Sequence, residues 1–307
     1  MRWSSMRIRL RLVRRSRFFA GARTGSLALA LTIVIALCEA CRIPADNCDD
    51  HIVTALRGNS PIVTPHARVW FSKDELSRRH AVRAAMQFEL GIADMSALFG
   101  PTDVAPFTID YFVSHDVRVP HTSTNRVFLS AEQVLTSASP YLHETAHAML
   151  NQRAAAISGR LNQPRSHVPI WFDEGLCEHF SELTARDNRG APSLVQSRAR
   201  LNSQVRSQIR TEAGQQVLQF VAFVDGPFSL VDANESERRA FYFEAHSFMN
   251  YLAARIGVGG VLTIYDGTVR SGLFTTQFRL IASKAPPELR RAWLETIFTD
   301  RMDESVQ

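Results

Sequence analysis

Two histidines and a glutamate within five consecutive residues are the part of this sequence best suited to chemistry. Residues 143–147 read HETAH, with Glu144 directly after the first histidine. On an α-helix, residues i and i+4 lie one turn apart on one face, so His143 and His147 could bind one metal ion together. Glu144 would stand beside that ion, where its carboxylate could take a proton from an attacking water. The motif therefore predicts a zinc site (Zn2+), but it is short and requires a third ligand.

A zinc ion in a hydrolase is held by three protein ligands and keeps one position open. Metzincins place a third histidine six residues after the second, with a glycine midway. Here those positions are Arg153 and Leu150, which excludes that ligand set. Two histidines and one carboxylate are another established set.

A segment downstream resembles a source of such a carboxylate. Residues 169–180 read PIWFDEGLCEHF, which resembles the segment that supplies the glutamate ligand in gluzincin metallopeptidases, where a tryptophan precedes a Glu-Gly pair at the start of a helix. With HETAH and a strand expected just before it, the region from 125 to about 260 resembles the thermolysin-like superfamily, especially its peptidase-MA-like members of bacterial envelopes. The resemblance implies that Glu174 is the third zinc ligand. Asp173 and His179 are rivals by residue type, but they lie on other faces of the expected helix.

The resemblance also implies supporting roles. Glu178 follows Glu174 by one turn, where an acid holds a zinc histidine by its other ring nitrogen; a solvated surface glutamate is the alternative. Tyr242 and His246 lie one turn apart in FYFEAHSFMNYL, and a downstream tyrosine or histidine donates a hydrogen bond to the oxyanion in thermolysin-like enzymes. The alternative for both is a packing role beside neighbouring phenylalanines.

Two further residues of the Glu174 segment have structural interpretations. Cys177 stands where the resembling proteins carry a small residue, so we expect a buried thiol instead of a ligand. Trp171 is expected to anchor the approach to the Glu174 helix. The step of 27 positions from His147 to Glu174 is longer than in the aminopeptidase-like branch, and the extra length falls in the polar loop 162–169.

The strands and helices expected around these residues indicate an α+β fold. It has a small mixed sheet before the zinc helix and a mainly helical second half. The resemblance implies a thermolysin-like zincin domain. The expected strands are 66–71, 107–113 and 125–130. The first expected helix is capped by Ser72 and Glu75 and ends near Phe99. The second starts at Ser139-Pro140 and carries HETAH in its second turn. The third is capped by Asn234 or Ser236 and runs to Gly257, and the last spans 287–298.

Basic residues are concentrated near the N-terminus. Eight of the 35 lysines and arginines lie in residues 1–41, so 27 basic residues stand against 29 acidic ones in the rest. This balance excludes nucleic acid as a partner, because a folded domain that binds it needs a basic patch.

An Arg-rich stretch, an apolar run at 26–37 and then small residues are typical of a secretory leader, with an uncleaved or lipidated membrane anchor as the alternative.

The expected organisation is a leader or membrane anchor at 1–41, a linker at 42–61, and one metallopeptidase domain at 62–307, with its sheet-containing half at 62–155 and its helical half at 156–307. Cys41 and Cys48 could close a small disulfide loop outside the cytoplasm, and unpaired or lipidated thiols are the alternative. We expect an extracytoplasmic protein, periplasmic or secreted, that contacts a membrane only through its N-terminal segment if that segment is uncleaved or lipidated. The sequence does not predict its oligomeric state.

The resulting hypothesis is a zinc peptidase that acts on a peptide or protein substrate. No G-x-S-x-G string or catalytic context for Cys177 competes with it. The chain has no G-x-M-E-N-like string of the kind that aminopeptidases of this superfamily use, which favours an endopeptidase. One alternative is a zinc-binding but non-catalytic envelope protein of the same fold that acts as an interaction module. Another is a non-enzymatic, membrane-tethered protein in which HETAH is accidental.

Overall fold

The structure is a computed structural model that describes residues 45–100, 108–137, 139–159, 167–187, 194–219, 221, 230 and 232–299. The chain divides after His51 into two compact units. Of the first unit, only the start of helix α2 (Ala45–Arg57) is described, and the sheet and all later helices belong to the second unit. The predicted leader, Cys41 and the side chain of Cys48 lie outside the described part. No helix in the described ranges is both long and apolar enough to cross a membrane.

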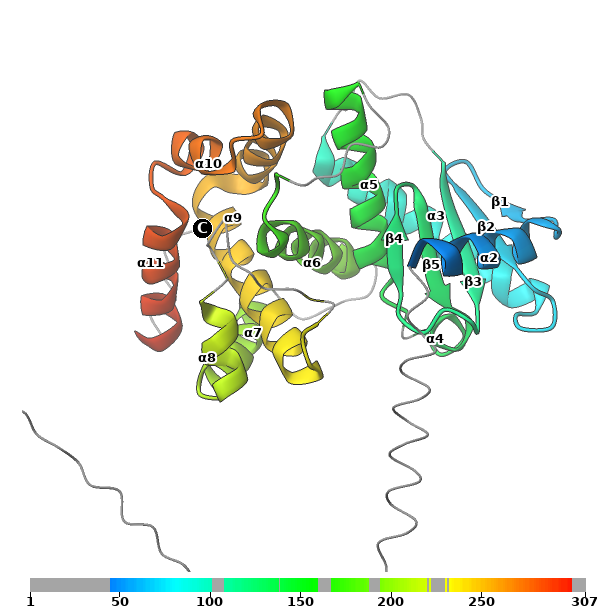
Figure 1. The fold of residues 1–307 in the computed structure, drawn as a ribbon, viewed down its shortest axis with the longest axis horizontal. Helices are drawn as coiled ribbons and strands as arrows, with labels where there is room; N and C mark the ends of the chain where they lie inside the picture. The colour runs from blue at the N-terminus through cyan, green and yellow to red at the C-terminus, as the bar shows by residue number, and fades with distance from the viewer. Residues whose placement is uncertain are drawn as a thin grey trace, which may run out of the picture. The chain divides into compact units, whose positions relative to one another are not determined.

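Five strands form one mixed sheet in the order β1-β2-β3-β5-β4 (Figure 1). They are β1 (Ile62–Val63), β2 (Ala67–Phe71), β3 (Ile109–Ser114), β4 (His121–Ser123) and β5 (Arg126–Ser130). The three central strands β2, β3 and β5 are parallel, and each edge strand pairs antiparallel with its neighbour. β3 is buried along its whole length, as expected for the centre of a sheet.

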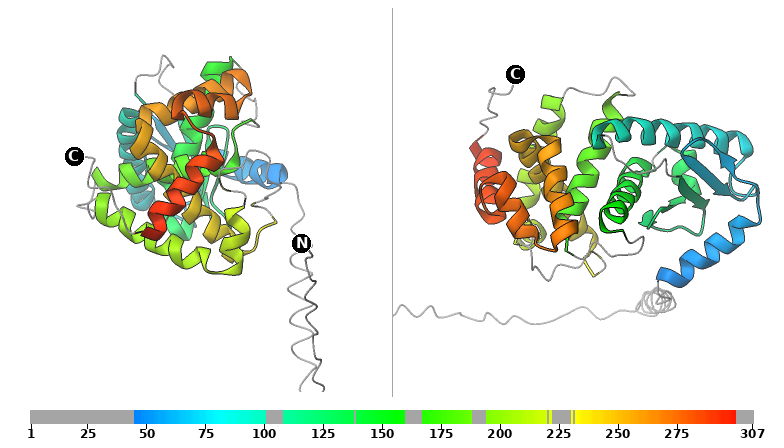
Figure 2. Two further views of the ribbon diagram at one scale, coloured as in Figure 1. Left: turned by 90° about the vertical axis from the view of Figure 1, so that its left-hand side faces the viewer. Right: turned by 90° about the horizontal axis from the view of Figure 1, so that it is seen from above.

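The rest of the second unit is helical. The helices are α3 (Arg78–Phe99), α4 (Ala131–Leu135), α5 (Tyr141–Ser158), α6 (Ile170–Asp187), α7 (Leu194–Ile209), α8 (Glu212–Leu218), α9 (Glu235–Ser271), α10 (Phe274–Ala282) and α11 (Pro286–Thr299). α5 and α6 pack against each other and lie between the sheet and the later helices, while α9 contacts both of them (Figure 1). Seen from above, the long α3 runs beside the sheet and the last helices stand at the opposite end (Figure 2).

This architecture confirms a small mixed sheet followed by a mainly helical half. The three predicted strands correspond to β2, β3 and β5, whereas the short edge strands β1 and β4 were not predicted. The cap of α9 is also confirmed, because Asn234 and Glu237 form a reciprocal capping box. The predicted end of this helix at Gly257 is a kink with φ of 74°, after which the helix continues to Ser271.

The predicted capping box at Ser72 and Glu75 is wrong. Helix α3 begins at Arg78, and the cap is Ser77, whose hydroxyl accepts the backbone N–H of His80. The carboxylate of Glu75 is instead used by a distant strand end, where it accepts hydrogen bonds from Ser114 Oγ at 3.3 Å and His115 N at 3.0 Å. This tertiary contact outweighs the local capping preference.

The predicted start of the HETAH helix is also wrong. Pro140 has ψ of 36° and lies outside the helix, so α5 begins at Tyr141 and HETAH begins in its first turn. No side chain caps this terminus, and Ser139 Oγ is buried with no hydrogen-bond partner in the described structure. HETAH therefore stands at the N-terminal end of α5, next to the sheet.

The predicted linker at 42–61 contains the whole of α2. Ile52, Val53 and Leu56 of this helix are buried in a small cluster with Phe112 and Phe128 from one face of the sheet.

The helical half has its own aromatic core. Trp171 is 1 % exposed, as expected for an anchor of α6, and its ring centroid lies 5.2 Å from that of Phe248 on α9.

Candidate metal centre

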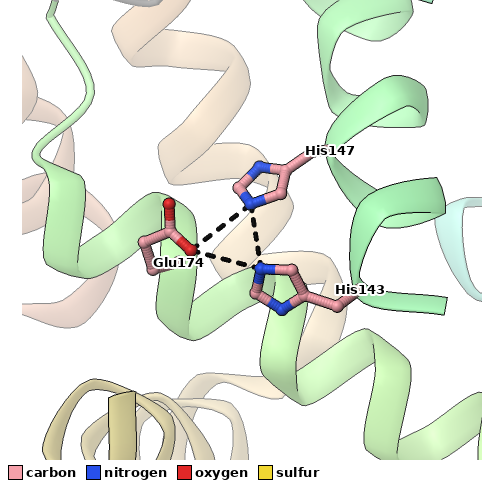
Figure 3. A group of neighbouring side chains, drawn as sticks. All are labelled: His143, His147 and Glu174. Carbon is pink, nitrogen blue, oxygen red and sulfur yellow. Dashed lines mark hydrogen bonds and ion pairs between the residues drawn. The ribbon is translucent and has the colours of Figure 1, made fainter. Parts of the chain in front are cut away.

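Three side chains converge between α5 and α6 (Figure 3). Nε2 of His143 lies 3.1 Å from Nε2 of His147, and Oε2 of Glu174 lies 3.2 Å and 3.3 Å from these two nitrogens. Both imidazoles are buried, and the Glu174 side chain is 14 % exposed. The structure thus brings together the three residues that the sequence pattern and the resemblance singled out.

The separations within this triangle suit a metal ion. Ligands about 2.0–2.1 Å from a tetrahedral zinc ion are about 3.3 Å apart from each other, close to the observed distances. Two imidazole nitrogens and one carboxylate oxygen also form a donor set that zinc accepts, with a fourth position left open. His143, His147 and Glu174 could therefore hold a metal ion.

Each histidine has a carboxylate at its second ring nitrogen. Glu178 Oε1 lies 3.1 Å from Nδ1 of His143, and Asp173 Oδ2 lies 3.3 Å from Nδ1 of His147. The contact of Glu178 is an ion pair by distance, since Nδ1 of His143 makes no hydrogen bond in the described structure. A carboxylate in such a place can orient the ring, hold the proton on Nδ1 and leave Nε2 to bind a metal. Glu178 lies where the resemblance placed it. Asp173, considered only as a rival ligand, lies outside the triangle and contacts the far side of a ligand ring.

Cys177 contacts the same nitrogen as Asp173. Its Sγ lies 3.2 Å from Nδ1 of His147, and the residue is completely buried, as the sequence predicted. Burial raises the pKa of this thiol to about 12, so it is protonated at neutral pH. The thiol is a small group behind the metal-binding ring. His179, the other rival, hydrogen-bonds Asn250 in the core, and burial lowers its pKa to about 4.

The charges of the centre are mutually dependent. Burial opposes ionisation of His143, but the carboxylates of Glu174 at 3.2 Å and Glu178 at 3.1 Å outweigh it and raise its pKa to about 9. Burial also opposes the charged form of Glu174, whose pKa nevertheless lies well below its usual range because both histidines face it. The surrounding carboxylates therefore raise the pKa of both histidines above neutral, and a bound cation would take the place of the protons they hold.

Glu144, the expected general base, is held by the edge strand β4. The hydroxyl of Thr122 lies 2.8 Å from Glu144 Oε2 and 2.9 Å from its backbone carbonyl oxygen, so it donates to one of them at a time. No donor from the described ranges reaches the other carboxylate oxygen of Glu144. One oxygen is thus positioned by the protein, and the second is available to a water.

The glycine after Glu174 allows α6 to approach α9 closely. A Cβ added to Gly175 would stand 2.6 Å from the backbone oxygen of Ala245 and 3.3 Å from the Cβ of Met249. Real side chains do not tolerate the first distance, and the atom met is backbone, which cannot rotate away. Gly175 therefore sets the position of the helix segment that carries Glu174.

Tyr242 and His246 differ in how close they lie to the three candidate metal ligands. The Tyr242 ring is centred 5.9 Å from that of His143, and its hydroxyl has no hydrogen-bond partner in the described ranges. Burial and the nearby Glu174 raise the pKa of Tyr242 above its usual value, so it remains a hydrogen-bond donor. Nε2 of His246 is already engaged, 2.9 Å from Oε2 of Glu182. Of the two candidates, Tyr242 is the one with an available donor beside the ligands.

Two supporting residues could not be assigned from the sequence. Asp173 had a detectable signal, an acid adjacent to the expected ligand, but its role depends on how α6 crosses α5. Thr122 had no detectable signal in the sequence, because β4 has only three residues and shows no alternation.

In comparisons with known proteins, no family model, curated protein or solved structure matches this chain.

Proposed function

We propose that this protein is a zinc metallopeptidase of the thermolysin-like type that hydrolyses peptide bonds. The observation that supports it most is the convergence of His143, His147 and Glu174, each donor atom 3.1–3.3 Å from the other two. The carboxylates behind both histidines add to this, because such partners serve to orient metal-binding imidazoles. The HETAH and WFDEG motifs and their order in the chain support the thermolysin-like assignment.

The chain supplies a group for each step of the hydrolysis. A bound zinc ion supplies a Lewis acid and lowers the pKa of its water towards ~7. Glu144, oriented by Thr122, accepts the proton of the attacking water and then delivers it to the leaving amine. The hydroxyl of Tyr242 donates a hydrogen bond to the oxyanion of the substrate carbonyl. No covalent bond between enzyme and substrate is needed.

The proposed location is outside the cytoplasm. It rests on the leader-like order of residues 1–41 and on the resemblance to envelope members of the superfamily. The proposed substrate is an internal peptide bond of a peptide or protein, because the aminopeptidase string is absent from the sequence.

Metal analysis and a cleavage assay test this function. We expect about one zinc per chain, cleavage of casein or a peptide library by the wild type, and no cleavage by Glu144→Gln with its zinc retained. Loss of zinc from the double variant His143→Ala/His147→Ala would locate the metal. A protein with one zinc that cleaves no peptide would favour the binding-module alternative, and a protein without metal would contradict both.

A further inference from the structure

A pocket of about 270 Å³ lies beside the metal centre, between α6, α7 and α9. Two of its lining residues also surround the ligands. Glu178 contacts Nδ1 of His143 at 3.1 Å, and the Tyr242 ring is centred 5.9 Å from that of His143. The pocket therefore lies on the Nδ1 side of His143, close enough to the centre for a side chain of a bound peptide to enter it, although no metal ligand lines it.

Two carboxylates from α6 give this pocket negative charge. Glu182 has both oxygens occupied, Oε1 by Ser197 at 2.6 Å and Oε2 by His246 at 2.9 Å and Asn250 at 3.0 Å. Burial opposes its ionisation, but these hydrogen bonds hold its pKa well below the usual range. Glu178 uses one oxygen towards His143, and its other oxygen has no partner among the described residues. An incoming cation therefore has one carboxylate oxygen to bind.

Apolar groups cover another part of the wall. Leu201 of α7 is 7 % exposed, and the half-buried rings of Tyr242 and Phe243 face the pocket from α9. Such a surface suits the methylene stem of a long side chain, which can bury its carbons while its charged end remains with polar groups. The pocket thus combines a site for a stem with a site for a cation.

Besides His246, which is paired with Glu182, the described lining contains Arg200, which lies in a different environment from the acids. It is exposed on α7, and within the described ranges it makes no ion pair. Solvent and salt screen an exposed charge far more than a half-buried one. An acidic ligand could pair with Arg200, but inside the pocket it would meet both Glu178 and Glu182.

We infer that this pocket selects a lysine or arginine side chain adjacent to the scissile bond. The inference rests on the proposed peptidase function and adds its substrate class. The acids supply the counter-charge, and Leu201 with the two aromatic rings supplies the contact for the stem. A bound basic residue would replace none of the existing hydrogen bonds of Glu182.

Peptide hydroxamates test the pocket independently of turnover. The purified protein is loaded with zinc and titrated with hydroxamates that differ only in one side chain, lysine, leucine or glutamate, in two series that place it on either side of the chelating group. We expect the lysine compound of one series to bind at least about 10-fold tighter than its glutamate counterpart. A peptide library should show the same preference at its cleavage sites.

Charge changes at Gln204 provide matched variants. This half-buried pocket residue takes no part in the metal centre. Gln204→Lys should reduce the lysine-to-leucine affinity ratio by about 10-fold, and Gln204→Glu should increase it.

The other outcomes separate the two proposals. Equal binding of the three compounds in both series would overturn the basic-residue pocket and leave the zinc centre standing. Tighter binding of glutamate would also overturn it and assign selectivity to Arg200. Failure to bind zinc or any hydroxamate would overturn the peptidase function, and the pocket inference with it.

Discussion

The hydroxyl of Thr122 on the sheet edge lies 2.8 Å from Oε2 of Glu144 on the HETAH helix. This contact joins the sheet to the proposed base and leaves the other oxygen of Glu144 available. Tyr111 makes a second connection of this kind, since its hydroxyl lies 2.7 Å from Oγ1 of Thr145. The sheet therefore fixes the first turn of α5, which no side chain caps.

Removing the Thr122 hydroxyl should slow catalysis without removing the metal. Thr122→Val keeps the shape of the side chain but frees the Glu144 carboxylate, so we expect kcat to fall by about 10-fold at unchanged zinc content. Thr122→Ser, which retains the hydroxyl, should recover most of the rate. Equal rates for the valine variant and the wild type would show that the hydrogen bond from Thr122 does not orient the Glu144 carboxylate for catalysis.

Glu178 should contribute to metal affinity through His143. Glu178→Ala removes the carboxylate from Nδ1, so we expect zinc to bind about 10- to 100-fold more weakly, measured by competition with a chelator. Glu178→Gln keeps an accepting oxygen and should lose less. Glu132→Gln on α4 changes an acid outside the centre and serves as a control. Unchanged affinity in Glu178→Ala would mean that the 3.1 Å contact does not orient the ring.

The centre could be predicted where its geometry is local. His143 and His147 share a helix face by spacing alone, and Glu178 follows Glu174 by one turn of the same helix. Asp173 could not be placed in this way. It contacts His147 only because α6 crosses α5 at a particular angle, a property of packing between helices.

The fold shows the same division. β2, β3 and β5 carry clear β-forming runs and were predicted, whereas β1 and β4 are too short to show a period. The box at Ser72 and Glu75 matched a capping pattern, yet the Glu75 carboxylate is used by the end of β3. Local patterns fail where a distant partner satisfies the same group better.

Substitutions of Tyr242 and His246 should affect different kinetic parameters, kcat for Tyr242 and KM for His246. Tyr242→Phe removes only the hydroxyl beside the ligands, so we expect kcat to fall by about 10- to 1000-fold while KM changes little. His246→Gln disturbs the pair with Glu182 and should act mainly on KM for substrates with a basic residue. The reverse pattern would assign the oxyanion contact to His246.

Glu244 should make the protein less stable as pH rises. It is fully buried on α9 with no hydrogen-bond partner in the described ranges, and burial raises its pKa to about 9 against the opposing effect of Arg290. Between its usual pKa of 4.5 and about 9, the folded protein holds a proton that the unfolded chain releases, so stability is lost across this range. Glu244→Gln should therefore be more stable than the wild type at pH 8, by on the order of 1–3 kcal/mol, and similar at pH 5.

Urea unfolding at both pH values measures this effect. Glu235→Gln, at an exposed position of the same helix, should shift neither value by more than about 0.5 kcal/mol. A Glu244→Gln difference that is the same at pH 5 and pH 8 would show that this carboxyl does not titrate between them.

Gly175 should be required for both packing and metal binding. In Gly175→Ala the new Cβ would meet the Ala245 carbonyl oxygen at 2.6 Å, so α6 must move away from α9 and carry Glu174 with it. We expect a loss of about 1–3 kcal/mol in unfolding free energy and at least about a 10-fold weaker affinity for zinc. Gly259→Ala is the matched control, because a Cβ there meets nothing within 4 Å and alanine favours the helix. If Gly175→Ala kept full zinc affinity after losing stability, the position of Glu174 would not depend on the contact between these two helices.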